Sequence, residues 1–349
     1  MKPSDRNRRS DERGVALMYV AIFLLVSLWF VSLAIDVGKL MAARTELQAA
    51  ADGAALAGAS AINPLTAQLN EDEAKARAAG TASSNHAYED LPTSVVINPD
   101  TDVEFPATRT VTVSVYRDAA HSNPVMLYFA QTLGLRWMGV RAKATAKVGP
   151  LTDICQGLAP FAPTEPPYGD FSKSCDSTYT MVVPVGQSQQ GNFHWIDYPN
   201  CAENDSTATK QGGAQELSYY IVNGYNCCFN IGDQVPETKP GANIGPVERA
   251  LQERWDADTD HTPDICYQQY TGNESRVFLC PIVGTFDLNG KKAIRILKFA
   301  AFFMKDRPVN MLQNGFKGQF IDYIAVGTVD DDLPPDSTAV YGVHLVPNP

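Results

Sequence analysis

The sequence lacks the short motifs that mark common enzyme and metal sites. It contains no HExxH, no GxSxG nucleophile elbow, no Walker phosphate loop and no CxxC pair. Its five histidines are scattered along the chain: His86, His121, His194, His261 and His344. We therefore predict no catalytic residue and no cofactor site. His194, in the run NFHWIDY, could belong to a binding groove, but a position in the core or on a strand is the simpler interpretation.

Charge is also sparse, and its distribution is uneven. Charged residues make up 19% of the 349 residues, and the net charge is -11. Residues 1–13 are net positive, so the rest of the chain is acidic. Nucleic-acid binding needs a basic face that releases counterions, and the acidic body argues against it. Hydrophobic residues reach 44%, which is enough for a packed core.

No charged residue occurs between Gly14 and Ile35. At about 1.5 Å per residue, a helix over this run measures roughly 33 Å and can cross a hydrocarbon core of about 30 Å. The apolar part of a secretory signal is usually only about 7–15 residues long, so we favour a permanent span over a cleaved signal. The basic tail, residues 1–13, is then expected in the cytoplasm, and the chain after Asp36 outside the inner membrane.

All seven cysteines follow the expected span, in the compartment where disulfides persist. They are Cys155, Cys175, Cys201, Cys227, Cys228, Cys266 and Cys280. An odd number leaves one thiol free or paired between chains. The adjacent Cys227 and Cys228 are expected to bond to different partners, and Cys266 and Cys280 could close a short loop. Disulfides are a better explanation of these residues than cysteine-based catalysis.

The apolar helix is expected to continue as an alanine-rich spine to Asn63-Pro64, because alanine is the best helix former and this dipeptide ends helices. A second helix is predicted after Pro64, ending near Gly80. The remaining elements predicted up to residue 150 are strands at 95–99, 108–118 and 139–150 and a helix at 125–135. Residues 36–150 thus form a spine plus a small α+β module.

A proline-rich stretch after Pro150 marks a boundary, and residues 151–349 are predicted to be a β-rich, disulfide-braced domain outside the cytoplasm. Its clearest signal is a hairpin across 276–306, where Asn289-Gly290 suits a type I′ turn. The other elements expected are strands at 179–186, 191–199 and 315–327 and a helix at 245–255. The overall class is α+β.

Small residues recur along the spine at Gly53, Ala54, Ala57, Gly58 and Ala61. This spacing permits the close approach of another helix. One interpretation is docking on a partner helix. The other, which we favour, is packing on the chain's own sheet.

The run DADTDHTPD places Asp256, Asp258, Asp260 and Asp264 at spacings that oxygen ligands of calcium use. His261 stands where a calcium-binding EF-hand loop has glycine, and Tyr267 where it has a bidentate glutamate, so the run is not an EF-hand. A looser calcium site and a solvated acidic loop remain the alternatives, and the acidic loop is the simpler one.

The N-terminal block resembles TadE/TadG-like proteins of the Flp (Tad) pilus assembly system. The resemblance rests on Asp36 with Gly38 just after the span, on Ala43-Arg44 and Leu47-Gln48, and on the run AADGAALA from Ala50. Residues 123–149 are similar to the short α+β continuation of TadG-related proteins. Some of those proteins carry a von Willebrand factor A domain, but its DxSxS metal loop is absent from this sequence.

The resemblance implies a single-pass protein of the bacterial inner membrane with a cytoplasmic N-terminus and a periplasmic C-terminal domain. Its partners would be other Flp/Tad assembly or pilin proteins. An alternative is a minor pilin-like subunit or tip adhesin in the filament, at the cell surface. Prepilins usually carry Glu at the fifth mature position, but processing after Gly14 would place Tyr19 there. The missing carboxylate favours an unprocessed anchor over a pilin, and a periplasmic enzyme is the least favoured alternative.

Overall fold

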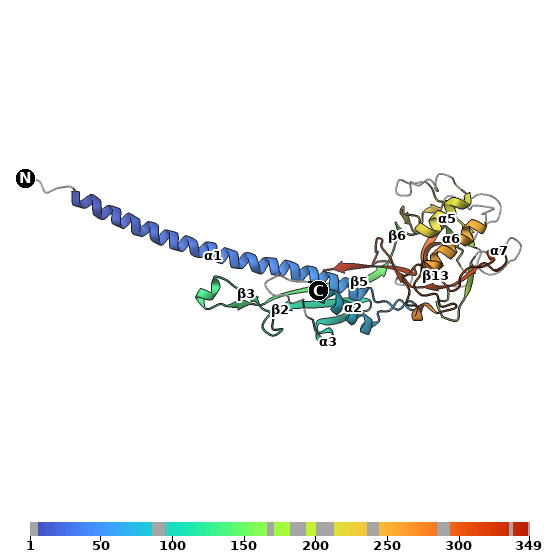
Figure 1. The fold of residues 1–349 in the computed structure, drawn as a ribbon, viewed down its shortest axis with the longest axis horizontal. Coiled ribbons are helices and arrows are strands. Elements are labelled where there is room, and N and C mark those ends of the chain that lie inside the picture. The colour runs from blue at the N-terminus through green and yellow to red at the C-terminus, as the bar shows by residue number, and fades with distance from the viewer. Residues whose placement is uncertain are drawn as a thin grey trace, which may run out of the picture.

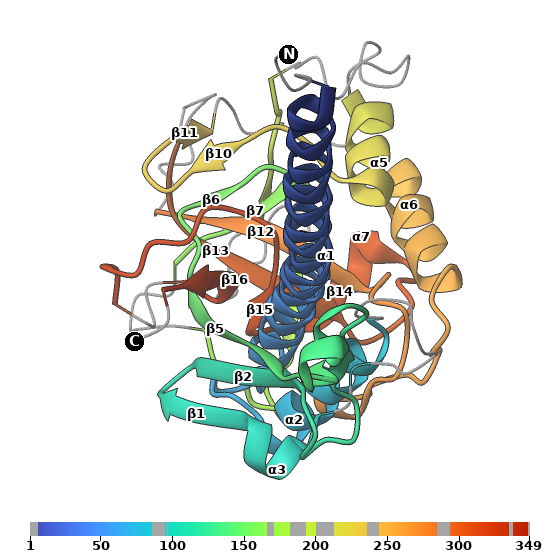
Figure 2. The same ribbon diagram turned by 90° about the vertical axis from the view of Figure 1, so that its left-hand side faces the viewer.

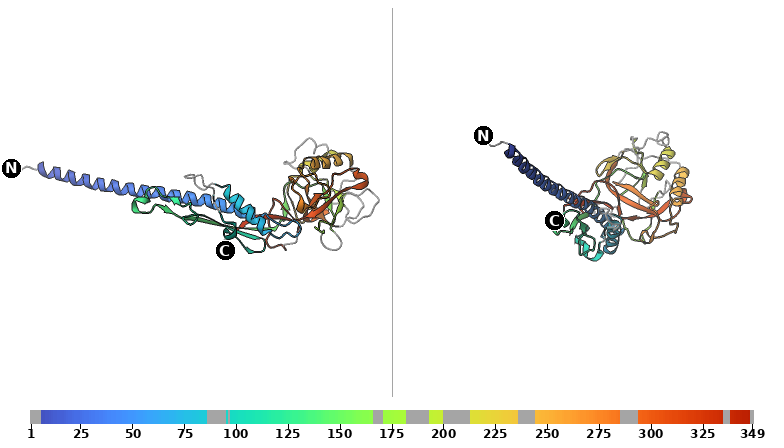
Figure 3. Two further views of the ribbon diagram at one scale, coloured as in Figure 1. Left: turned by 60° about the horizontal axis from the view of Figure 1, so that its bottom comes forward. Right: turned by 60° about the vertical axis from the view of Figure 1, so that its left-hand side comes forward.

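The computed structural model describes residues 6–85, 95, 97–165, 171–181, 193–199, 213–235, 244–284, 294–334 and 338–347. The chain is elongated, with a long helix at one end and two bodies that contain β-sheets following it along the same axis (Figures 1 and 3). This arrangement confirms the predicted α+β class and the long N-terminal helix.

The first element, α1, is a single uninterrupted helix from Arg6 to Ala59. It begins inside the segment expected to be a polar tail and ends shortly before Asn63-Pro64, as the sequence indicated. Its surroundings change at Asp36. From Val15 to Ile35 large side chains are exposed on every side of the helix, whereas after Asp36 one stripe is buried at helical spacing, including Ala43, Leu47, Ala50 and Ala54.

A second helix, α2 (Glu71–Ser83), packs alongside the end of α1. It starts later than predicted because Asn70 caps it, accepting the backbone N–H of Glu73 at 3.3 Å. Its buried residues are alanines spaced four apart: Ala74, Ala78 and Ala82. This spacing puts them on one face, against α1.

The first sheet has the strand order β1-β2-β5-β16-β15 and lies against α1. Its strands are β1 (Val103–Ala107), β2 (Thr110–Arg117), β5 (Val140–Pro150), β15 (Tyr323–Ile324) and β16 (Val340–Val346). The two main predicted strands are confirmed as β2 and β5. The pairing of β16 with β5 was not predicted. We call α1 from Asp36 onward, α2 and this sheet the spine unit.

Two predictions in this region are wrong. No strand forms over the described residues of 95–99, because Asn98 caps the short helix α3 (Pro99–Asp102) by accepting the N–H of Asp100. The helix predicted at 125–135 is instead a hairpin of β3 (Val125–Met126) and β4 (Trp137–Met138). Its tip is the 3-10 turn η1 (Ala130–Leu133), which ends at Gly134 with a positive φ of 89°.

The second body, which we call the distal unit, is built on a sheet of order β11-β13-β14-β8, with β12 paired to β13. Its strands are β8 (Tyr179–Met181), β11 (Gln234–Val235), β12 (Val277–Val283), β13 (Ile294–Met304) and β14 (Phe316–Ile321). The antiparallel pairing of β12 with β13 confirms the predicted hairpin strands. The expected Asn289-Gly290 turn lies outside the described residues.

Helices α5 (Gly213–Asn223) and α6 (Ile244–Asp256) lie side by side against the distal sheet, as Figure 2 shows. On β13, Phe302 and Met304 belong to the core that includes these helices, and Phe299 and Phe303 belong to the core on the other face. Because both faces are covered, the strand is a continuous apolar run rather than an alternating one. Helix α6 was predicted, and α5 was not.

Short elements complete the distal unit. Strands β6 (Asp153–Ile154) and β10 (Phe229–Asn230) pair with each other, as do β7 (Phe161–Pro163) and β9 (Phe193–Trp195). The turn η3 (Tyr267–Gln269) and the short helix α7 (Met311–Asn314) lie in connections.

Candidate functional site

The first candidate site is the exposed half of α1. Large apolar side chains are exposed from Val15 to Ile35, among them Trp29 at 50% and Phe30 at 70%. By length and composition this is the one described helix able to cross a membrane. A helix that is apolar on all sides fits a lipid environment, because in aqueous solution every one of its apolar faces would be exposed to water.

Asp36 marks the point where α1 leaves this apolar stretch. Its carboxylate accepts three successive backbone N–H groups at the tip of the β3–β4 hairpin: from Tyr128 at 2.8 Å, from Phe129 at 2.9 Å and from Ala130 at 2.6 Å. Burial opposes ionisation, but these three bonds and the nearby Lys39 hold the pKa of Asp36 below its ordinary value. The ammonium of Lys39 lies 3.9 Å from the centre of the Tyr128 ring. The hairpin is thus fastened to α1 beside the end of the apolar stretch.

An apolar groove of about 480 Å³ lies between the hairpin tip and α1. On the helix side it runs from Leu25 to Leu33, and on the hairpin side it includes Phe129 and Leu133. Eight residues along a helix correspond to about 12 Å. The groove therefore overlaps the segment of α1 that is long and apolar enough to span a membrane.

The small residues of the spine pack inside this chain. A Cβ added to Gly58 would lie 3.1 Å from Val111 Cγ1 and 3.2 Å from the Ala74 carbonyl, and one added to Gly53 would meet Thr81. Ala54 and Ala61 are fully buried. The small residues therefore let α1 approach the first sheet and α2 closely. This agrees with the favoured interpretation, packing on the chain's own sheet.

The cysteines brace the distal unit. Cys155 is bonded to Cys228, and Cys175 to Cys266. Cys227 is disulfide-bonded as well, so the two adjacent cysteines have different partners, as expected. The suggested Cys266–Cys280 loop is wrong: Cys280 is a buried free thiol on β12, where burial raises its pKa. Cys201 lies outside the described residues.

The four aspartates considered as calcium ligands bind different partners. Asp256 forms a double contact with Arg307, Asp258 accepts the hydroxyl of Tyr270, and Asp264 pairs with Lys305 at 2.8 Å.

Asp260 accepts backbone N–H groups from Thr262 and Thr271, which lower its pKa to about 2. Among the residues that the structure describes, no three His, Cys, Asp or Glu side chains are placed to hold a metal ion. The structure thus does not bring the four carboxylates together.

The four histidines in the described parts of the chain lie in different elements or connections. His121 contacts Asp118 at 2.7 Å, and His344 contacts Asp331 at 3.1 Å. His261 is exposed, and its ring lies tilted at 56° to that of Trp255, with the ring centres 6.3 Å apart. His194 lies on β9, where its backbone pairs with Ala162 of β7, and this agrees with the predicted strand position. His86 lies outside the described residues.

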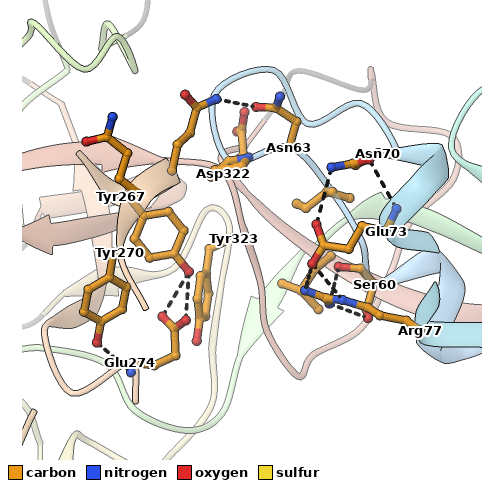
Figure 4. Close-up of a pocket in the computed structure, with 15 residues that line it drawn as sticks. Ser60, Asn63, Asn70, Glu73, Arg77, Tyr267, Tyr270, Glu274, Asp322 and Tyr323 are labelled. Carbon is orange, nitrogen blue, oxygen red and sulfur yellow. Dashed lines mark hydrogen bonds and ion pairs between the residues drawn. The ribbon is translucent and has the colours of Figure 1, made fainter. Parts of the chain in front are cut away.

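A polar cleft of about 790 Å³ separates the two units (Figure 4). On the spine side Arg77 contacts Glu73 at 2.5 Å and the Ser60 hydroxyl at 3.0 Å. On the distal side the hydroxyl of Tyr267 donates to Glu274 at 2.9 Å. Tyr323 of β15, in the first sheet, also lines the cleft, and burial raises its pKa to about 12. These groups can hydrogen-bond a polar segment.

The fold and these sites define an elongated α+β protein built on one helix that is able to span a membrane. Comparison with known families matches residues 14–61 to the family described as "Putative Flp pilus-assembly TadE/G-like". The N-terminal segment of the chain is therefore TadE/G-like, as its residues indicated, and the match ends close to the end of α1. No curated protein and no solved structure matches the chain.

Sequence reasoning missed two features of these sites. The role of Asp36 depends on a hairpin that follows more than ninety residues later, so spacing alone could not reveal it. The signal that could have found it is the isolated acidic residue at the end of a long apolar run, where a charge needs a partner. The cleft between the units arises from the return of the chain at β15 and had no sequence signal.

Proposed function

We propose that this chain is a membrane-anchored assembly protein of a Flp (Tad) type pilus or a related secretion system. The observation that carries the proposal is the TadE/G-like match over residues 14–61, which coincides with a helix that is apolar on all sides from Val15 to Ile35. The remainder of the chain acts outside the cytoplasm by binding other pilus components, without catalysis.

The orientation follows from charge and cysteine chemistry. The basic residues before Gly14 favour a cytoplasmic N-terminus. The disulfides Cys155–Cys228 and Cys175–Cys266 suit an oxidising compartment such as the periplasm. Both arguments support the same topology, with the spine and distal units on the periplasmic side.

The test is deletion of the gene in a strain that makes Flp pili, followed by electron microscopy and a count of pili per cell. We expect loss of pili, restored by the full chain but not by a chain in which residues 14–35 are replaced by a cleavable signal. Normal piliation in the deletion strain would contradict the assembly role. Extraction of the chain from membranes by alkaline carbonate would contradict the anchor.

A minor pilin-like subunit is the second candidate, and the shape of α1 favours it. The helix is exposed from Val15 to Ile35 and packed on the first sheet after Asp36, so it could serve as the spine of a filament subunit. Mass spectrometry of the purified chain separates the two roles. A mature chain that begins at Val15 and is present in sheared pili would establish the subunit role, whereas an intact N-terminus confined to membranes would establish the anchor.

A further inference from the structure

The β3–β4 hairpin carries a concentration of exposed apolar side chains that is unusual for a surface in water. Between residues 125 and 138 the only charged residue is Arg136. The exposed large side chains are Met126, Tyr128, Phe129, Leu133, Leu135, Trp137 and Met138. The chain therefore presents an apolar hairpin where a soluble domain would carry polar residues.

The hairpin is held at a defined level along α1. The three N–H groups of residues 128–130 bound to Asp36 fix its tip beside the end of the apolar stretch. Beyond that point the tip faces Leu25 to Leu33 across the apolar groove. Figure 1 shows the hairpin lying along α1 and directed toward the N-terminus. The exposed apolar surface of the hairpin is thus continuous with that of the helix.

Basic side chains lie on the side of the hairpin that is nearer to the spine unit. A second cleft, of about 830 Å³, lies between α1 and the sheet and is lined by Arg44, Arg141 and Lys143 together with Met41 and Met138. Arg44 and Arg141 are exposed. This basic surface contrasts with the acidic remainder of the chain and is complementary to the phosphate groups of anionic lipids.

We propose that the 125–138 hairpin is a second membrane contact, inserted into the periplasmic leaflet beside the span. Lipid acyl chains fill the groove against Leu25–Leu33, and lipid phosphates lie near Arg44, Arg136 and Arg141. The groove extends about 12 Å along the helix, comparable to the 5–10 Å depth reached by interfacial elements. This inference rests on the proposed anchoring of α1 and adds a fixed rotation and height of the spine unit relative to the membrane.

Tryptophan fluorescence tests the proposal because Trp29 and Trp137 occupy different levels. The full chain is reconstituted into vesicles of phosphatidylethanolamine and phosphatidylglycerol that contain lipids brominated at a shallow or a deep acyl position. We expect Trp137→Phe to remove the part of the fluorescence that shallow bromine quenches. Trp29→Phe should remove the part that deeper bromine quenches. Quenching of the Trp137 component by aqueous iodide alone would overturn the hairpin insertion.

Substitutions in the hairpin provide a second arm. We expect Leu133→Asp to abolish lipid quenching of Trp137, whereas Val326→Asp, at an apolar position exposed to 80% in the chain after β15, leaves it unchanged. Retained quenching in Leu133→Asp would overturn the proposal. So would a Trp137 that is protected only in cross-linked dimers, because that result assigns the face to a second copy of the chain. A Trp29 that no brominated lipid quenches would instead contradict the anchor itself.

Discussion

The carboxylate of Asp36 lies 2.6 Å from the backbone nitrogen of Ala130, in a part of the chain ninety-four positions later. The same carboxyl group also accepts the N–H groups of Tyr128 and Phe129. One side chain thus satisfies the first N–H groups of the hairpin tip, as a capping residue does for a helix. The height at which the hairpin meets α1 is set by this residue.

We expect Asp36→Ala to release the hairpin from α1, because three N–H groups lose a charged acceptor at once. The docking free energy should fall by about 2–4 kcal/mol, since hydrogen bonds to charged groups are among the stronger ones. Hydrogen exchange measures this as faster exchange of the amides of residues 128–130. Asp52→Ala, at a half-buried acidic residue further along the same helix, serves as the control, and unchanged protection in Asp36→Ala would contradict the role.

The same contact should depend on pH. The pKa of Asp36 is lowered in the folded chain, so the ionised form is favoured by folding. Its contribution is fully present above the ordinary value of 3.8 and is lost as the pH falls through the lower folded value. The hairpin should therefore stay closed near neutral pH. Amide exchange at residues 128–130 should report its opening only below about pH 3.8. Opening that begins near neutral pH would exclude Asp36 as its cause.

Removal of the Cys175–Cys266 bridge should destabilise the distal unit. The two cysteines are 91 residues apart, and the chain-entropy relation gives about 4–5 kcal/mol for a loop of that length. The double variant Cys175→Ser, Cys266→Ser should unfold at a lower urea concentration, measured by circular dichroism. Cys280→Ala changes a cysteine without removing a cross-link and is the matched control. Equal midpoints for the double variant and the parent chain would show that the bridge adds no stability.

Substitution of alanine at two glycines should change the stability of the chain in opposite directions. A Cβ on Gly318 would overlap the Phe303 carbonyl oxygen and the Phe302 ring, so Gly318→Ala should separate β14 from β13 and cost about 3 kcal/mol. Gly245, at the start of α6, has nothing within 4 Å of an added Cβ, so Gly245→Ala should stabilise the chain by about 0.4–1 kcal/mol. Thermal unfolding of the two variants gives the comparison, and a stable Gly318→Ala chain would contradict the packing described for β13 and β14.

The thiol of Cys280 should not react in the folded chain. It is fully buried, burial raises its pKa, and its sulfur lies 3.6 Å from the Ala300 carbonyl oxygen. Thiolate is the reactive form, so alkylating reagents should label this residue only after unfolding. Mass spectrometry of native and denatured samples measures the labelling, with Cys280→Ala as the blank. Rapid labelling of the native chain at Cys280 would contradict its burial.

The long helix was readable from the sequence because its signals are local. Alanine-rich composition, an uncharged run and the Asn63-Pro64 stop each act within a few residues. The same holds for α6, for the hairpin strands β12 and β13, and for the strand content of 139–150. In each case propensity and packing favour the same structure.

Residues 125–138 show why the remainder could not be predicted. Their apolar pattern suits a helix, and the middle does form one turn at η1, but Gly134 ends it and Met126 pairs with Trp137 across the hairpin. That pairing and the bond to Asp36 are tertiary contacts, which override local propensity. The pairing of Cys175 with Cys266 and the return of β16 to β5 depend on contacts between distant segments in the same way.

The return of β16 also bears on how the molecule carries load. The distal unit lies between β5 and β16 in the chain, and these strands pair antiparallel from Tyr341–Pro150 to Val346–Thr145. A force that pulls the distal unit away from α1 acts along both strands together. The pull is then shared by β5, which continues along the chain into the spine unit, and by β16, which is held to β5 by the hydrogen bonds of the ladder. The distal unit is thus connected to the first sheet at both of its chain ends and again at β15, so it does not hang from a single linker.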